Sequence, residues 1–215
     1  MDFKVKYPWA EQRVYCSNLG NLHRHPSFQK DYDKWTEETV KRGGPMVNIL
    51  LKRLDWDGPP ALPNKTGAGG TTEPDYFTVD IPDELVRVVI NDWPYSVPLD
   101  VTHFIIWSRV PFVHEMVTPY RIKDRVARDG LWGFTGGITQ PKASDKDAHL
   151  IRQASIEIQM FVEQVWPEDE WETAWFMNPL RLQSVPGLAH THVFAKPKVT
   201  LVTEGTGEIS ESPSQ

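Results

Sequence analysis

The sequence is poor in cysteine, with Cys16 alone among its 215 residues. A single cysteine excludes an intrachain disulfide and a cysteine-based zinc site, so we expect a reducing compartment. A transmembrane helix needs about 20 consecutive apolar residues, and the chain has no apolar run that approaches this length. Its first residues also lack the apolar core of a signal peptide. A cytoplasmic protein without membrane association is therefore expected.

An excess of positive charge is absent as well, because 23 Lys and Arg face 29 Asp and Glu, a formal net charge of −6. This balance argues against a protein whose whole surface binds nucleic acid, although it leaves room for a local basic patch. A nucleotide phosphate loop is not expected either. Gly67 to Thr72 lack the lysine and the preceding strand of that motif, and we interpret them as linker.

The rest of the chain predicts one folded domain between two poorly structured ends. Residues 1–25 show no clear pattern, residues 26–202 carry the periodic apolar positions, and residues 203–215 have the composition of a disordered tail. Inside the domain, residues 57–74 are rich in Gly, Pro and Thr and are expected to form a loop. A hydrophobic share of 40%, with nine Trp, is sufficient for a buried core.

Three helices are expected from apolar residues at helical spacing. The first begins with an N-cap at Ser27 and ends before Gly43. The second begins at Pro45 and ends near Trp56, and the third, with the clearest apolar stripe, spans Asp147–Val165.

Short β-branched and aromatic runs predict the strands, and Thr102–Ser108 has the most typical composition. The other expected strands are Tyr76–Asp80, Leu85–Ile90, Thr173–Met177, His190–Lys196 and a last one at Val199–Val202. Residues 111–145 give no clear assignment apart from a glycine-rich loop around Gly130 to Gly137. This order of elements predicts a single α+β domain, with a mostly antiparallel sheet packed by several helices.

The last third of the chain holds the densest chemistry. A carboxylate cluster that includes Glu168, Asp169 and Glu172 leads into a strand, and His190 and His192 then share one face of the next strand by the two-residue period. Carboxylates and imidazoles on a rigid sheet can hold a cation, move protons or bind a metal. The plainer interpretation of the acidic cluster is a solvated turn after a helix.

The histidine pair leaves several interpretations open. The two rings can act as proton shuttle and oxyanion donor, or join His103 around a metal, although no further ligand has standard spacing and no metal is expected. The His-x-His pattern also allows a histidine nucleophile for nucleotidyl transfer, but Phe194 stands where a histidine-triad strand carries its third His. The plainest interpretation is one buried, hydrogen-bonded ring and one exposed ring.

Further polar and aromatic residues are candidates for substrate binding. The turn Asn91–Tyr95 either lines a pocket with its aromatic rings or closes the core as a tight turn. Ser108 is a candidate acyl acceptor, without the Gly-x-Ser-x-Gly context of a nucleophile elbow. The expected substrate contacts are Asn91, Asp92, Trp93, Tyr95, His103, Trp107, Ser108, Asn178 and Gln183.

Four segments together resemble a known family. They are Asn91-Asp-Trp-Pro-Tyr95, Thr102-His-Phe-Ile-Ile-Trp-Ser108, Trp175-Phe-x-Asn178 and Leu182-Gln-Ser-Val-x-x-Leu-x-His-x-His-Val193. Over residues 27–198 the chain resembles a fungal family of small cytosolic proteins labelled N-acetylglucosamine-induced protein or domain of unknown function. Within that group it is similar to arginine-containing cyclodipeptide synthases, which carry an acidic Asp-Asp-x-x-Glu motif; here Glu168 replaces the first Asp.

The resemblance implies a reaction. Such an enzyme condenses arginine from arginyl-tRNA with a second amino acid from another aminoacyl-tRNA, and it needs no cofactor because both esters are already activated. For this reaction we expect Glu172 to act as base or arginine contact, supported by Asp169 and Glu168 of the acidic motif. Proton transfer or oxyanion stabilisation by His190 and His192 is expected from their imidazole chemistry.

A tRNA partner implies basic surface, for which the plainer interpretation is a solvated helix face. The candidates are Arg109, Arg121, Lys123, Arg125, Arg128, Lys196 and Lys198. Two other functions stay open. One is a hydrolase or transferase that acts on a small phosphorylated or nucleotide ligand through the two histidines, and the other is a non-catalytic family member that binds a sugar or another protein.

Overall fold

The computed structural model of the protein describes residues 22–56, 74–136, 146–183, 185 and 187–198. Within these ranges five strands form one antiparallel sheet in the order β1-β2-β5-β4-β3. The strands are β1 (Val86–Ile90), β2 (Thr102–Ser108), β3 (Leu131–Thr135), β4 (Trp171–Met177) and β5 (Ala189–Pro197). The long strands β2, β5 and β4 therefore form the centre of the sheet, and β1 and β3 are its edges.

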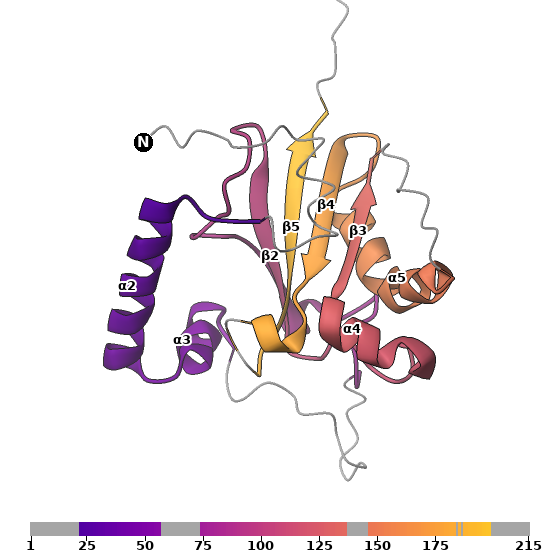
Figure 1. Ribbon diagram of the computed structural model, residues 1–215, viewed down its shortest axis with the longest axis horizontal. Helices are drawn as coiled ribbons and strands as arrows, with labels where there is room; N and C mark the ends of the chain where they lie inside the picture. Colours follow the sequence, from indigo (N-terminus) through magenta and orange to yellow (C-terminus); the bar gives the residue numbers. More distant parts are fainter. Residues whose placement is uncertain (1–21, 57–73, 137–145, 184, 186, 199–215) are drawn as a thin grey trace, which may run out of the picture.

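Four α-helices accompany the sheet in the described ranges, which makes the fold α+β. They are α2 (Pro26–Gly43), α3 (Met46–Arg53), α4 (Lys123–Asp129) and α5 (Ala148–Val165). Single 3-10 turns lie at η2 (Asp83–Leu85), η3 (Tyr120–Ile122) and η4 (Leu180–Leu182). Figure 1 shows α2 and α3 on one side of the sheet and α4 and α5 on the other. No helix in these ranges combines the length and the apolar character needed to cross a membrane.

The largest core cluster lies between α5 and one face of the sheet. Ile158 and Val162 of α5 pack with Trp175 of β4 and Val193 of β5, all at most 1% exposed. The indole N–H of Trp175 donates to Gln159 Oε1 at 2.7 Å, so the largest side chain of this core has a hydrogen-bond partner. The apolar stripe of α5 thus fixes which face of the central strands is sealed from water.

The opposite face of the sheet carries His190 and His192 together with Trp107 and Ile105. Residues directly opposite in an antiparallel register share a face, and the register pairs Trp107 with His190 and Ile105 with His192. Helix α3 covers part of this face, since its Leu51 packs in one cluster with Ile105 and Trp107. The histidines therefore lie on the side of the sheet that α2 and α3 accompany.

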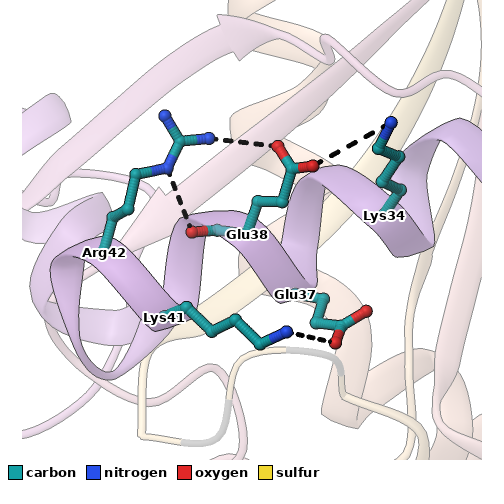
Figure 2. Close-up of polar contacts among 5 residues, drawn as sticks. All are labelled: Lys34, Glu37, Glu38, Lys41 and Arg42. Carbon is teal, nitrogen blue, oxygen red and sulfur yellow. Dashed lines mark hydrogen bonds and ion pairs between the residues drawn. The ribbon is translucent and has the colours of Figure 1, made fainter.

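Helix α2 is an amphipathic helix that contributes no fully buried residue. Its solvent side is lined by ion pairs one turn apart, and Figure 2 shows Lys41 with Glu37, and Glu38 with both Lys34 and Arg42. Pairs of this kind on exposed helix surfaces contribute little to stability. The position of α2 depends instead on its aromatic side, which faces the rest of the protein.

Most of the elements expected from the sequence are confirmed. Strand β2 has the expected bounds, and α5, β1, β4 and β5 begin and end within two residues of the expected positions. The α+β class and the antiparallel sheet are confirmed as well. The helix expected from Ser27 forms, but its N-cap is His25, whose imidazole accepts from the Ser27 N–H, and Pro26 is its first residue.

One expected strand and one expected loop are wrong. Residues Tyr76–Asp80 form no strand, because Phe77 is held in the core by a bond from its N–H to Pro111 O at 3.0 Å and by a ring contact with Phe112. The expected glycine-rich loop at Gly130 to Gly137 contains strand β3 instead. Its Gly133 lies opposite Trp175, and a Cβ there would be 2.6 Å from the indole Nε1, so the glycine makes room for a core side chain.

Several expectations fall outside the described residues. These are the unpatterned segment up to residue 21, most of the loop at 57–74 with its Gly67 to Thr72 linker, the strand at Val199–Val202 and the tail at 203–215. Helix α4 lies in the segment 111–145, which has no clear assignment from the sequence, and its seven residues carry five charges, as in the solvated helix face considered for the basic residues.

Candidate functional site

A cavity of about 140 Å³ lies between α2, α3 and the face of the sheet that carries the two histidines. Its floor is formed by His190 and His192 of β5 with Trp107 and Ile105 of β2. Its walls are aromatic and cationic and come from three further segments: Arg24, Tyr32 and Trp35; Leu50 and Arg53; and Asn91, Asp92 and Trp93. A cavity of this size holds about one amino-acid-sized group, well below a drug-sized site.

The turn Asn91–Tyr95 is held against the floor through His103. Asn91 Oδ1 accepts from the Trp93 N–H at 3.0 Å, which fixes the orientation of the amide, and its Nδ2 lies 3.3 Å from His103 Nδ1 and 3.4 Å from His103 Nε2. The Tyr95 N–H also donates to His103 Nδ1, at 3.2 Å. The turn therefore lines the cavity and also closes the core. Trp93 and Asp92 line the cavity, while Tyr95 packs on His103 and Phe176.

His103 links this turn to the histidine pair. Its Nε2 lies 3.0 Å from Nδ1 of His192, and both rings are buried, at 2% and 6% exposure. Burial, with a smaller contribution from the charge of Arg24, lowers the pKa of His103 from 6.5 to about 3. Burial also lowers the pKa of His192 well below 6.5, with help from its histidine neighbours and Arg24. Both rings are therefore neutral at physiological pH.

His190 has a different environment. Its Nδ1 lies 3.1 Å from Leu188 O, and its ring packs on Trp107 with centroids 4.7 Å apart. Burial lowers the pKa of His190, an effect that the hydrogen bond to the Leu188 carbonyl opposes in part. The plain expectation of one buried and one exposed histidine is wrong, because both His190 and His192 are buried.

A second cavity of about 300 Å³ lies on the other side of the Asn91–Tyr95 turn. His103 and Asn91 line it, together with Phe28 and the segment from Pro94 to Val101. His103 lines this cavity and His192 lines the first, so the His103–His192 contact lies between the two. Within the described residues, no group of three or more His, Cys, Asp or Glu is arranged to hold a metal ion.

Arginine 24 is a site residue that the sequence did not indicate. Its Nε donates to Trp93 O at 2.9 Å, and its guanidinium carbon lies 4.2 Å from the Tyr32 ring centre and 5.0 Å from that of Tyr95. It precedes α2 in a stretch without periodicity, so no local pattern marks it. Tyr32 and Trp35 were expected only as one face of a helix, and Arg53 only as part of the second helix.

The acidic cluster lies away from the cavity. Glu168 and Asp169 are exposed in the turn between α5 and β4, and Glu168 Oε1 accepts from the Gly136 N–H at 2.9 Å. Glu172 lies opposite Lys196, whereas Phe176 lies opposite His192. Four strand positions, about 13 Å, therefore separate Glu172 from the level of His192.

Three expected substrate contacts also lie elsewhere. Ser108 is on the α5 face of the sheet, fully buried, and its Oγ donates to Val110 O at 2.8 Å. Asn178 and Gln183 follow β4 and are joined by a bond from Gln183 Nε2 to Asn178 O, and neither lines the two cavities described above.

The basic candidates do not converge on one patch. Arg121, Arg125 and Arg128 lie on η3 and α4, and each forms an ion pair with an aspartate. Lys196 pairs with Asp100 at 2.9 Å, and the Lys198 Nζ donates to Glu168 O, both at the opposite end of the sheet. The exposed Lys123 lies on α4 with Arg125 and Arg128. Arg109 lies with neither these residues nor the two lysines, and its guanidinium carbon is 6.0 Å from the centre of the Trp56 ring.

Comparison with known proteins gives two matches. The model of the family described as "Protein of unknown function (DUF3605)" matches residues 7–196. A solved structure titled "Crystal Structure of HTC1" is similar, with a TM-score of 0.53 and 18% sequence identity. The similar region covers 88% of this chain and 85% of the chain in that structure. At that identity the likeness shows a shared fold alone. No curated protein gives a significant match.

Proposed function

The chain belongs to the DUF3605 family, and we propose that it is a tRNA-dependent cyclodipeptide synthase. In this proposal it joins arginine from arginyl-tRNA to a second amino acid from another aminoacyl-tRNA, in the cytosol, as a member of the arginine-containing branch of the fungal induced-protein family. The observation that carries the proposal is a convergence. Three of the four segments that resemble the fungal induced-protein family, separated by up to about 100 residues in the sequence, contribute side chains to one cavity.

The contents of the cavity suit aminolysis of an ester. Each of the two condensation steps needs a group that accepts a proton from an amine and a donor that stabilises the tetrahedral oxyanion. His190 and His192 are neutral, buried and adjacent, with ring centroids 5.6 Å apart. Buried donors and acceptors of fixed orientation stabilise developing charge more effectively than groups in water. The reacting amine and the ester carbonyl would therefore meet at the histidines of this cavity.

Arginine recognition requires a carboxylate, and the cavity offers Asp92. Its side chain is 46% exposed and pairs with Arg53, which is 53% exposed. A substrate guanidinium could take the place of Arg53 as partner of Asp92, since guanidinium groups bind carboxylates bidentately. Glu172, the base or arginine contact implied by the family resemblance, would instead have to act from the far end of β4 on another part of a long tRNA substrate.

Reconstitution tests the function directly. The purified protein would be supplied with total tRNA, aminoacyl-tRNA synthetases, ATP, arginine and the other amino acids, and the small-molecule products analysed by mass spectrometry. We expect a cyclic dipeptide that contains arginine and disappears after RNase treatment. Absence of any such product with active synthetases would refute the proposal.

Two variants separate the possible arginine sites. Asp92→Asn should raise the KM for arginyl-tRNA if Asp92 holds the guanidinium. Glu172→Gln should abolish the product if the acidic cluster serves the reaction, and Glu170→Gln, an exposed neighbour in the same turn, is its matched control. A loss confined to Glu172→Gln would place the arginine contact or base in the acidic cluster.

A second candidate function rests on the arginines of the cavity. Arg24 and Arg53 both line it beside the histidine pair, and two guanidiniums near imidazoles suit a phosphate group. The alternative is therefore a hydrolase or transferase for a small phosphorylated or nucleotide ligand. Titration with inorganic phosphate and with AMP, followed by NMR of the histidine rings, should shift the His190 and His192 signals if it holds. Without a product or a phosphate shift, a non-catalytic sugar- or protein-binding role is left, for which the aromatic walls offer stacking surfaces.

A further inference from the structure

The tautomer of His192 is set by a chain of hydrogen bonds that begins at the backbone. The Tyr95 N–H can only donate, so His103 Nδ1, 3.2 Å away, must be an unprotonated acceptor. The Asn91 amide nitrogen, also a donor, lies 3.3 Å from this atom and 3.4 Å from His103 Nε2, so it is the Tyr95 N–H that decides which ring nitrogen accepts. A neutral His103 therefore carries its proton on Nε2 and donates it to His192 Nδ1 at 3.0 Å. His192 must then carry its own proton on Nε2.

His190 has the opposite tautomer for an equally simple reason. The Leu188 carbonyl oxygen can only accept, so His190 Nδ1, 3.1 Å away, must carry the proton. The neutral ring then has a lone pair on Nε2. Within the described residues, no further hydrogen bond to a protein group engages either ring, which leaves Nε2 of both for a ligand. Both rings line the same cavity.

We propose that the two histidines have opposite roles: His192 Nε2–H donates a hydrogen bond to a ligand carbonyl oxygen, and His190 Nε2 accepts a proton from a ligand N–H or O–H. The cavity then selects an N–H or O–H donor placed next to a carbonyl, as in an amine that attacks an ester. The fixed protonation sites also imply that the two residues, although two positions apart on one strand, are not interchangeable. The part of this proposal that concerns catalysis rests on the proposed function.

In that reaction the amine of one aminoacyl group attacks the ester carbonyl carbon of the other. The C–N bond forms, the carbonyl electrons move to an oxyanion held by His192 Nε2–H, and the amine proton passes to His190 Nε2. The carbonyl then re-forms as the C–O bond to the tRNA ribose breaks, and His190 returns the proton to the leaving ribose oxygen. A second, intramolecular repetition closes the ring and releases the second tRNA, so no other co-reactant is consumed.

The surroundings of the rings keep both roles available near neutral pH. His192 is stacked on Phe176 with centroids 4.8 Å apart, and His190 packs on Trp107. The Arg24 guanidinium lines the same cavity and brings a positive charge near the rings. The carboxylate of the cavity, Asp92, is paired with Arg53. The charge of Arg24 helps to lower the pKa of His192, and burial lowers the pKa of both rings, so the neutral tautomers persist.

The assignment can be tested on the unmodified protein. Two-bond 15N–1H NMR correlations of histidine-labelled protein distinguish the two neutral tautomers, and the signals are assigned by their loss in His190→Gln and His192→Gln. We expect the Nδ1–H form for His190 and the Nε2–H form for both His103 and His192. The same tautomer for His190 and His192, or a charged ring at pH 7, would overturn the proposal. Because no substrate is present, this result is independent of whether the protein makes a cyclic dipeptide.

Single-turnover kinetics then test the roles in the proposed reaction. His190→Ala should lose about 100-fold or more in rate and regain part of it with added imidazole, which can occupy the space and accept a proton. His192→Asn, which keeps an N–H donor, should be at least tenfold faster than His192→Leu, because loss of an oxyanion donor costs about 100- to 1000-fold. Imidazole rescue of His192→Leu but not of His190→Ala would reverse the assignment. The predicted tautomers without any product would refute the proposed function and leave the binding roles intact.

Discussion

Nε2 of His103 and Nδ1 of His192 lie 3.0 Å apart, in a diagonal contact across the adjacent strands β2 and β5. His103 is directly opposite Phe194 in the register, so its ring leans along the sheet to reach His192. Asn91 and the Tyr95 backbone hold the other side of the His103 ring. The contact joins residues 89 positions apart, and the geometry of the cavity floor depends on it.

The buried histidines predict a loss of stability in mild acid. The pKa of His103 falls from 6.5 to about 3 on folding, and those of His190 and His192 are lowered as well. Between about pH 6.5 and 3 the unfolded chain therefore binds more protons, so the free energy of unfolding should fall as the pH falls. One such histidine contributes at most about 1.4 kcal/mol per pH unit. Urea unfolding at pH 7, 6 and 5 measures the slope.

A variant pair identifies the source of that slope. His103→Gln removes one depressed pKa and should reduce the pH dependence, whatever its effect on stability at pH 7. His149→Gln changes an exposed histidine on α5 and should leave the dependence as it is. An unchanged slope in His103→Gln would show that other groups cause the acid sensitivity.

Asn91→Ala should destabilise the protein although it removes only a small side chain. The amide is 9% exposed, and its loss leaves the Trp93 N–H without its acceptor and His103 Nδ1 without one donor. We expect a cost of about 1–3 kcal/mol, in the range for buried polar groups that lose their partners. Denaturant unfolding would measure it, with the exposed Asn48→Ala in α3 as control. Equal stability of the two variants would contradict the importance of this turn.

Gly133→Ala should also destabilise the fold, in this case by overpacking. An added Cβ would lie 2.4 Å from Gln159 Oε1 and 2.6 Å from Trp175 Nε1, two atoms that are bonded to each other in the core. Relief of such a clash costs about 1–3 kcal/mol. Gly43→Ala is the matched control, because its Cβ would meet only the flexible end of Ile49 at 2.9 Å. Thermal unfolding of both variants checks the difference, and a neutral Gly133→Ala would show that β3 is free to shift.

Trp93→Ala should loosen α2 without loosening α5. The Trp93 ring contacts Phe28, Tyr32 and Trp35 at centroid distances of 5.0, 5.6 and 5.3 Å, and α2 has no fully buried residue of its own. Aromatic pairs contribute about 0.5–1.5 kcal/mol each, so amide hydrogen exchange in α2 should become roughly tenfold faster or more. Trp132→Ala on β3 is the control. Unchanged exchange in α2 would mean that other contacts fix this helix.

The strands and helices that the sequence predicted well are those whose pattern is local. β2 is a run of β-branched and aromatic residues, and α5 has an apolar stripe that only a helix places on one side. β3 was missed because its Gly133 resembles a loop residue, and its role appears only when Trp175 lies opposite. The strand expected at Tyr76–Asp80 is the opposite error. Its apolar residues resemble a strand, but Phe77 is buried by loop contacts with Pro111 and Phe112.

The candidate site divides in the same way. The amino-acid sequence by itself determined that His190 and His192 share a face, because side chains alternate along a strand, and that Asn91–Tyr95 is a turn. Only the tertiary structure decided that His103, Arg24 and α2 meet these residues, that the acidic cluster lies four strand positions away, and which ring nitrogens carry protons. A strand's period is a property of a few neighbouring residues, whereas hydrogen-bond partners, burial and protonation depend on chain segments that pack together from distant parts of the sequence.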